Sequence, residues 1–235
     1  MTLLMSSDVL KIIVGVAVVI ILGIILYTAI VSFSPSARPS GSIPLSSVEV
    51  RSYEGEPLSS INDFRENSIS GPQYINISEY RLTVTGLTNK TLNYSYDQVL
   101  KEYPHYSKVV TLFCVEGWEV TLLWEGVRIE DLLEEAGPSP QANTVIFKSH
   151  DGYTTSLPLD YIRDRNIIIA YAMNGVTLPP ERGYPFQLVA EDRWGYKWAK
   201  WVEEIELTDN PNYRGYWEQR GYSNTADINK SYFRD

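Results

Sequence analysis

Residues 113–118 read FCVEGW and contain Cys114, the only cysteine among the 235 residues of the chain. They overlap an apolar run at 109–113 (VVTLF), which predicts a buried β-strand that ends at the cysteine. After it, Gly117 lets the backbone turn, and Trp118 can wall a pocket beside the sulfur. A lone cysteine is in general more often a small buried apolar side chain than a ligand. The stretch is therefore either a core position or a ligand site, and the surrounding sequence must decide between them.

Short strand patterns outnumber helix patterns on both sides of this stretch. Ser95 and Gln98 form a capping-box pattern that opens a short helix ending at Glu102, and a second helix is predicted at 129–136, before Gly137. There is no internal repeat and no β-α-β alternation with a Gly-rich loop, which excludes the Rossmann and P-loop classes. These patterns predict an α+β fold dominated by mixed β-structure. Strands are predicted at 80–86, 109–113, 119–124, 144–148, 167–173, 186–190 and 201–207.

The charge balance and the scarcity of metal-ligating side chains exclude several function classes. The formal net charge is −9 and the acidic residues are spread along the chain, which excludes nucleic acid as the main partner. One cysteine cannot form an intramolecular disulfide, and one cysteine with two histidines cannot build a zinc finger or a CxxCH haem site. We therefore expect that an enzyme of this composition takes its chemistry from a cofactor.

Two N-terminal segments precede the main domain, which is predicted to span 48–235. Residues 12–33 (IIVGVAVVIILGIILYTAIVSF) carry no charged side chain and are long enough to cross a bilayer as a helix. The segment 1–33 is therefore predicted to be a single-pass membrane anchor rather than a cleaved signal peptide. Residues 34–47 (SPSARPSGSIPLSS) lack periodicity and predict a flexible tether.

Several weak signals bear on which side of the membrane the main domain lies. The charges that flank the apolar run do not decide the orientation, and no twin-arginine pair of the kind expected for folded export is present. We nevertheless expect the main domain to be extracytoplasmic, because the chain carries four sequons for N-glycosylation. These begin at Asn76, Asn89, Asn93 and Asn229.

A series of sequence blocks around and after Cys114 is similar, in order and spacing, to the molybdopterin-binding domain of the sulfite-oxidase-like oxidoreductases. The resemblance extends from about residue 80 to residue 207, which makes it more specific than any single motif. Upstream, 64–67 (FREN) resembles a segment of that family that reaches the cofactor, and 216–223 (YWEQRGYS) resembles its closing segment. The central blocks are FCVEGW at 113–118, WEGV at 124–127, SHDGYTTSLPL at 149–159, AYAMNG at 170–175, GYPFQLV at 183–189 and WGYKWAKW at 194–201.

The resemblance implies a sulfite-oxidase-type fold that binds molybdenum on a molybdopterin, with Cys114 as the thiolate ligand of the metal. Glu116 would face the metal and handle a proton. Lys197 and Lys200 are the preferred pair for the pterin phosphate, in the densest basic cluster of an acidic domain. The other residues that the resemblance assigns to the cofactor are Asn67, Ser149, Arg182, Gln187 and Trp198.

Two of these positions depart from the family pattern, and they leave alternatives open. Gln187 stands where many members have Arg, and Arg182 stands where some have Asn, so we expect the phosphate contacts to be redistributed. Gln187 and the absent twin arginine favour a cofactor-free cell-surface binding module on the same fold, whereas Cys114 argues against it.

The resemblance implies an enzyme that moves an oxygen atom to or from a small substrate. Because the chain has no haem or iron–sulfur motif, electrons must be exchanged with a separate carrier, and we expect a membrane redox protein. The alternative to a sulfite oxidase is a methionine-sulfoxide or other S/N-oxide reductase. The Cys-Val-Glu pattern at 114–116 and the predicted anchor favour that alternative.

Overall fold

The structure is a computed structural model that describes residues 48–233. The predicted anchor at 12–33 and the predicted tether at 34–47 lie outside the described residues. Within 48–233, no helix has both the length and the apolar composition that a membrane crossing requires.

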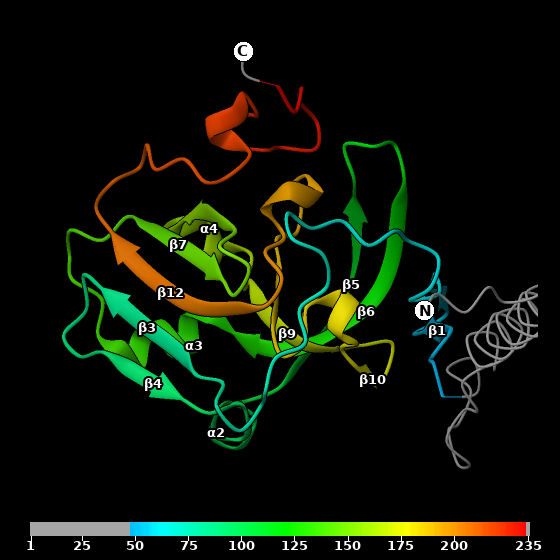
Figure 1. The fold of residues 1–235 in the computed structure, drawn as a ribbon, viewed down its shortest axis with the longest axis horizontal. Helices are drawn as coiled ribbons and strands as arrows, with labels where there is room; N and C mark the ends of the chain where they lie inside the picture. The colour runs from blue at the N-terminus through cyan, green and yellow to red at the C-terminus, as the bar shows by residue number, and fades with distance from the viewer. Residues whose placement is uncertain (1–47, 234–235) are drawn as a thin grey trace, which may run out of the picture. The chain divides into compact units, whose positions relative to one another are not determined.

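One five-stranded sheet contains the strand that ends just before Cys114. Its order is β10-β9-β6-β5, with β11 also paired to β9, and all of its pairings are antiparallel (Figure 1). Its strands are β5 (Tyr106–Phe113), β6 (Glu119–Arg128), β9 (Ile168–Met173), β10 (Val176–Thr177) and β11 (Gln187–Val189).

A second five-stranded sheet has the order β4-β3-β12-β7-β8. Its β3–β12 pairing is parallel, whereas its other pairings are antiparallel. In Figure 1, β12 runs between β3 and β7, which places the C-terminal strand in the middle of the sheet. The strands are β3 (Leu82–Gly86), β4 (Leu92–Tyr94), β7 (Thr144–Ser149), β8 (Thr154–Pro158) and β12 (Val202–Thr208).

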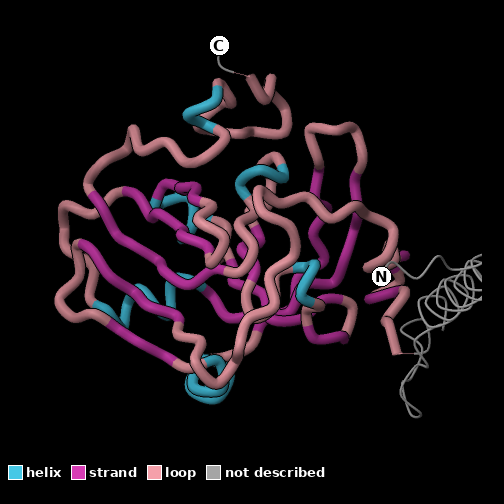
Figure 2. Tube along the Cα trace, in the orientation of Figure 1, coloured by secondary structure: helices cyan, strands magenta, loops and turns pink. Residues whose placement is uncertain are grey.

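Short helices and long loops connect these strands, as Figure 2 shows. A small hairpin of β1 (Ser52–Tyr53) and β2 (Glu56–Pro57) lies at the start of the described chain. The α-helices are α2 (Tyr96–Glu102), α3 (Ile129–Ala136) and α4 (Leu159–Asp164), and the 3-10 helices are η2 (Pro180–Arg182), η3 (Gly195–Lys197) and η4 (Glu218–Arg220).

Local sequence signals fix the ends of several elements as predicted. At α2, the Ser95 hydroxyl accepts from the Gln98 backbone N–H, and the Gln98 side chain accepts from the Ser95 N–H. Helix α3 ends where Gly137 adopts a left-handed backbone with φ of 70°. Asn174 and Gly175, with φ of 48° and 74°, turn the chain from β9 into β10. The predicted α+β class with dominant mixed β-structure is therefore confirmed.

Two tryptophans connect β5 and the loop around Trp198 with the hydrophobic core. Trp124 on β6 has no exposed surface, and its indole N–H donates to the carbonyl oxygen of Val110 at 3.2 Å. The Trp124 ring lies 5.4 Å from the ring of Trp198, centroid to centroid. Aromatic pairs of this kind add packing energy beyond that of their buried area. The contact between Trp124 and Trp198 therefore holds the loop around Trp198 against the core.

Candidate functional site

A cavity of about 450 Å³ lies where six segments of the described chain meet. Most of its walls come from loops and strand ends, which a rigid pair of sheets holds in place. The segments are 64–71, 112–118, 151–153, 181–187, 195–201 and 217–222.

Cys114 lines this cavity as the first residue after β5. A tight turn presents it, because the Cys114 N–H donates to the Trp118 carbonyl at 2.9 Å and the Gly117 N–H donates to the Cys114 carbonyl at 3.0 Å. Gly117 has a φ of 85°, a left-handed conformation that favours glycine. The thiol is free and 9% exposed, and the Asn67 amide nitrogen lies 3.7 Å from its sulfur as a donor. Burial raises the pKa of the Cys114 thiol, and the Asn67 amide acts in the opposite direction.

Glu116 lies two residues beyond the cysteine, exposed at the same cavity. Its carboxylate accepts from the Trp118 indole N–H at 3.2 Å. This hydrogen bond, the Asn67 amide and the positive charge of Arg65 lower the pKa of the Glu116 carboxyl. The structure therefore brings Cys114, Glu116 and Asn67 together at one cavity, with Glu116 ionised at neutral pH.

Two buried polar atoms at or beside the cavity have no hydrogen-bond partner within residues 48–233. They are the Gln187 Oε1 on β11 and the Ser149 Oγ at the end of β7. Gln187 lines the cavity, whereas Ser149 pairs with Val202 in the sheet, next to the loop that carries Lys200. An unsatisfied buried polar atom costs about 1–3 kcal/mol, and native proteins keep few of them. A bound group with a donor for the Gln187 oxygen and an acceptor for the Ser149 hydroxyl would remove that cost.

Arg182 and Lys200 line the cavity and are each held by the segment that contains Asn67. The Arg182 guanidinium donates to the carbonyl oxygens of Ile61 at 3.2 Å and Phe64 at 2.6 Å. The Lys200 ammonium forms an ion pair with Glu66 at 2.6 Å. Burial lowers the pKa of Arg182 and that of Lys200, and in Lys200 the Glu66 carboxylate opposes this effect.

Lys197 does not reach the cavity, although it was expected beside Lys200 at the cofactor phosphate. Its side chain has no exposed surface and its ammonium pairs with Glu218 at 2.5 Å. The reason is local: η3 turns the side chain of Lys197 inward, toward β8, while the neighbouring Trp198 lines the cavity. Of the cofactor residues predicted from sequence, Lys197 thus has another contact, and Ser149 lies beside the cavity rather than in its lining.

Several cavity residues have no role in the sequence prediction. Glu66 stands next to the predicted Asn67, but nothing in the sequence indicates that it pairs with Lys200 across the cavity wall. Tyr196, Trp217 and Tyr222 also line the cavity. For Trp217 and Tyr222, the sequence offers one indication of a role at the site, the resemblance of 216–223 to the closing segment of the family.

The site fits a molybdopterin better than a bare metal ion. Among the described residues, no three His, Cys, Asp or Glu side chains are grouped so as to hold a metal. A metal at Cys114 must therefore bring most of its own ligands, as a pterin dithiolene does, and a thiolate suits a soft sulfur ligand set. Buried orphan atoms, a lysine and aromatic walls provide polar, charged and stacking contacts for the organic part.

The fold and the site define a cofactor-dependent oxidoreductase of the sulfite-oxidase type. Residues 69–217 match the model of the oxidoreductase molybdopterin-binding domain family, and the chain belongs to that family. It is accordingly a molybdopterin-binding oxidoreductase whose cofactor contains molybdenum.

Known relatives agree with this assignment. The chain is 36% identical to an uncharacterized oxidoreductase, YuiH, of Bacillus subtilis (strain 168), over 66% of this chain and 78% of YuiH. It is 31% identical to the putative protein-methionine-sulfoxide reductase subunit YedZ1 of Azospira oryzae, over 63% of this chain and 56% of that protein. It is 28% identical to the catalytic subunit MsrP of the protein-methionine-sulfoxide reductase of Gluconobacter oxydans, over 56% of this chain and 47% of that protein. The chain thus spans about half the length of these two reductase proteins.

The fold is also similar to a solved structure, the sulfane dehydrogenase SoxCD from Paracoccus pantotrophus. The TM-score is 0.60 with 21% sequence identity, over 75% of this chain and 57% of that chain. This likeness confirms the sulfite-oxidase-type fold and carries no information on the substrate.

Proposed function

We propose that the protein reduces neutral S-oxides, such as sulfoxides, by oxygen-atom transfer. In this reaction the S–O bond breaks, the sulfur gains two electrons from a separate carrier, and the oxygen leaves as water with two protons. The single observation that carries the proposal is the charge of the cavity lining, which contains three cationic and four anionic side chains. The cations are Arg65, Arg182 and Lys200, and the anions are Glu66, Glu116, Asp151 and Glu181.

This lining disfavours anionic substrates such as sulfite and nitrate. Lys200 is already paired with Glu66, and Arg182 donates to two backbone carbonyls. A bound pterin phosphate would add further negative charge. Because a buried anion needs a nearby fixed positive charge, a neutral polar substrate fits this cavity better than an anion.

Molybdenum on a pterin supplies two-electron exchange coupled to oxygen-atom transfer when the cofactor is bound. In the proposal Cys114 is the protein ligand to the metal, and Asn67, which donates toward the sulfur, keeps that side chain oriented. Glu116, whose lowered pKa keeps its carboxylate ionised in the free protein, would pass protons from solvent to the leaving oxygen. Lys200 and Ser149 hold the phosphate end, and Gln187, Arg182 and Trp198 hold the pterin.

The names of two relatives support a sulfoxide substrate, since both are called methionine-sulfoxide reductase proteins.

We also propose that electrons come from a separate redox protein. We further propose that 12–33 anchors the chain in a membrane with the main domain outside the cytoplasm, for which the apolar composition and the sequons are the support.

The experiment is a comparison of substrates with holoprotein from a host that makes molybdopterin. Dimethyl sulfoxide and the methyl ester of N-acetyl-methionine sulfoxide, both uncharged, are tested with a reduced viologen as donor, nitrate with the same donor, and sulfite with ferricyanide as acceptor. We expect kcat/KM for the neutral S-oxides to exceed that for either anion at least about tenfold, a transition-state difference of about 1.4 kcal/mol. The Cys114→Ser variant should lose this activity, because an alkoxide is a harder ligand than a thiolate.

Two results would overturn the proposal. A preference for sulfite or nitrate would show that the cavity selects anions. Substoichiometric molybdenum in protein from several such hosts would favour the cofactor-free binding module instead.

A further inference from the structure

The last described segment, 213–233, contributes to the cavity although most of it lies beyond the family match, which ends at residue 217. After β12 the chain crosses back over the fold and ends above it in Figure 1, drawn from orange to red. Trp217 and Tyr222 from this segment line the cavity together with Tyr196 from η3.

These three aromatic side chains form one continuous wall. The ring centroids of Trp217 and Tyr222 are 5.2 Å apart, and those of Tyr196 and Tyr222 are 5.1 Å apart. Trp217 remains 36% exposed, so part of its ring is open at the edge of the cavity. An aromatic face that is open to a cavity offers a stacking surface for an apolar or aryl group of a ligand.

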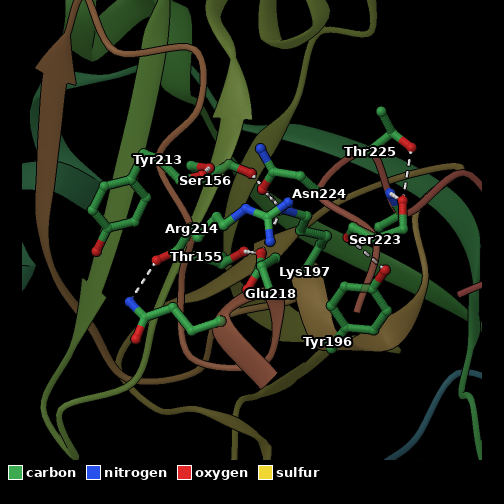
Figure 3. A network of polar contacts seen from close by, with 12 residues as sticks. Thr155, Ser156, Tyr196, Lys197, Tyr213, Arg214, Glu218, Ser223, Asn224 and Thr225 are labelled. Atoms are coloured by element: carbon green, nitrogen blue, oxygen red, sulfur yellow. Dashed lines mark hydrogen bonds and ion pairs between the residues drawn. The ribbon is translucent and has the colours of Figure 1, made fainter. Parts of the chain in front are cut away.

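A buried ion pair holds this wall from behind. Between Trp217 and Tyr222 the chain places Glu218, whose side chain has no exposed surface, like that of its partner Lys197 (Figure 3). The Lys197 ammonium also donates to the Ser156 carbonyl at 3.0 Å, and the Thr155 hydroxyl donates to the same Glu218 oxygen at 2.8 Å. Both of these residues lie on β8, so the pair joins the C-terminal segment to the second sheet.

The ion pair lies in η3 and η4, and the wall residues lie in or within two residues of these two short elements. Helix η3 carries Lys197 on its buried side and Tyr196 at the cavity, and the Tyr196 hydroxyl donates to the Ser223 carbonyl at 2.9 Å. Trp217 directly precedes η4, which begins at Glu218. A shift of the ion pair would therefore move the aromatic wall.

We propose that Trp217 and Tyr222 are specificity-determining residues that contact the organic substituent of the S-oxide, and that Lys197 and Glu218 are positioning residues that fix this wall. The inference rests on the proposed function, and it names the preferred substrates as S-oxides that carry an aryl or extended apolar group. A small dialkyl S-oxide would not reach the wall.

The first test measures ligand binding rather than turnover. Phenyl methyl sulfone and dimethyl sulfone serve as unreactive probes, titrated into holoprotein by calorimetry. In Trp217→Ala and Tyr222→Ala, the preference for phenyl methyl sulfone over dimethyl sulfone should fall at least tenfold relative to the unmodified protein. Tyr213→Ala is the matched control, because Tyr213 is a half-buried aromatic residue of the same segment that neither lines the cavity nor packs against Trp217 or Tyr222. An unchanged preference in both wall variants would overturn the proposal, and so would loss of pterin from them, which would assign the wall to the cofactor.

The second test addresses the positioning pair. Lys197→Met leaves Glu218 buried without its lysine, and we expect the same loss of aryl preference at wild-type molybdenum content. The double variant Lys197→Met with Glu218→Gln removes both charges of the ion pair and should regain at least half of the lost preference. A purely structural role predicts equal weakening of both sulfones instead. Loss of molybdenum in Lys197→Met would return this lysine to the phosphate role that the sequence suggested.

The two proposals fail separately. If no S-oxide is reduced but the sulfone preference depends on Trp217 and Tyr222, the proposed reaction is wrong and the wall stands. If S-oxides are reduced with no dependence on these residues, the reaction stands and the wall is wrong.

Discussion

Cys114 becomes a site residue through its surroundings rather than through its own properties. A buried thiol with a raised pKa is an ordinary core group, and a metal must displace its proton before it can bind. What distinguishes this cysteine is a cavity on one side of it and an amide donor, Asn67, directed at its sulfur. The neighbouring Glu116 adds a carboxylate that is ionised at neutral pH. Glu116 lies two residues from the cysteine, whereas Asn67 lies 47 positions upstream, so only the fold could bring the amide to the sulfur.

At the same scale, Lys200 is predicted to hold the cofactor. Lys200→Met should purify with less pterin, because a charge-assisted hydrogen bond contributes about 1.5–3 kcal/mol, or roughly tenfold to 150-fold in affinity. Lys148→Met is the matched control, since Lys148 also pairs with carboxylates, Glu204 at 3.1 Å and Glu206 at 2.7 Å, but does not line the cavity. Pterin fluorescence and molybdenum content are measured on each preparation. Full occupancy in Lys200→Met would remove this lysine from the cofactor site.

At the scale of elements, β6 is the strand on which the geometry of the site depends. It pairs with β5, which ends just before Cys114, and with β9, which in turn pairs with β11, the strand that carries Gln187. The β6–β9 register shifts between Glu125 and Gly126, a bulge that bends the strand. A Cβ at Gly126 would collide with the backbone of Ile169 on β9, so the two strands approach as closely as they do only with glycine here.

Gly126→Ala is therefore predicted to destabilise the fold by several kcal/mol, because two backbones would have to separate at the centre of a sheet. Gly55→Ala provides the comparison, because Gly55 has a φ of 89° but a methyl group there would meet no atom within 4 Å. Only backbone strain of about 1–2 kcal/mol is expected for this variant. Urea unfolding of both variants measures the difference. Equal losses would show that β6 and β9 can separate at little cost.

At the scale of the whole molecule, the sequence predicted local elements well and long-range contacts poorly. The capping box at Ser95 and the glycine end of α3 follow from neighbouring residues, and both are confirmed. The parallel pairing of β3 with β12 joins residues more than a hundred positions apart, and no local pattern encodes it. The same limit explains Lys197, since its partner Glu218 comes from the C-terminal segment and competes with any phosphate for its charge. Strand β8 and helix α4 were missed because 154–164 has neither a clear alternation nor a side-chain cap.

The tyrosines give a last prediction, because burial raises the pKa of nine of them above the ordinary value of 10.0. The pKa of Tyr94 and that of Tyr96 are each raised to about 12. Burial also raises the pKa of Tyr153 and that of Tyr196 at the cavity, so both stay neutral hydrogen-bond donors near neutral pH, and the ionised Glu116 is the group that can relay protons. A phenol whose pKa is raised by folding adds stability that is complete below pH 10 and is lost as the pH rises through the pKa of the folded state.

Absorbance at about 295 nm should therefore show that many phenols of the folded protein remain protonated at about pH 11, whereas urea-unfolded protein titrates near pH 10. The free energy of unfolding should fall over the same interval. Complete ionisation by pH 11, with the far-ultraviolet circular dichroism unchanged, would contradict the buried positions of these side chains.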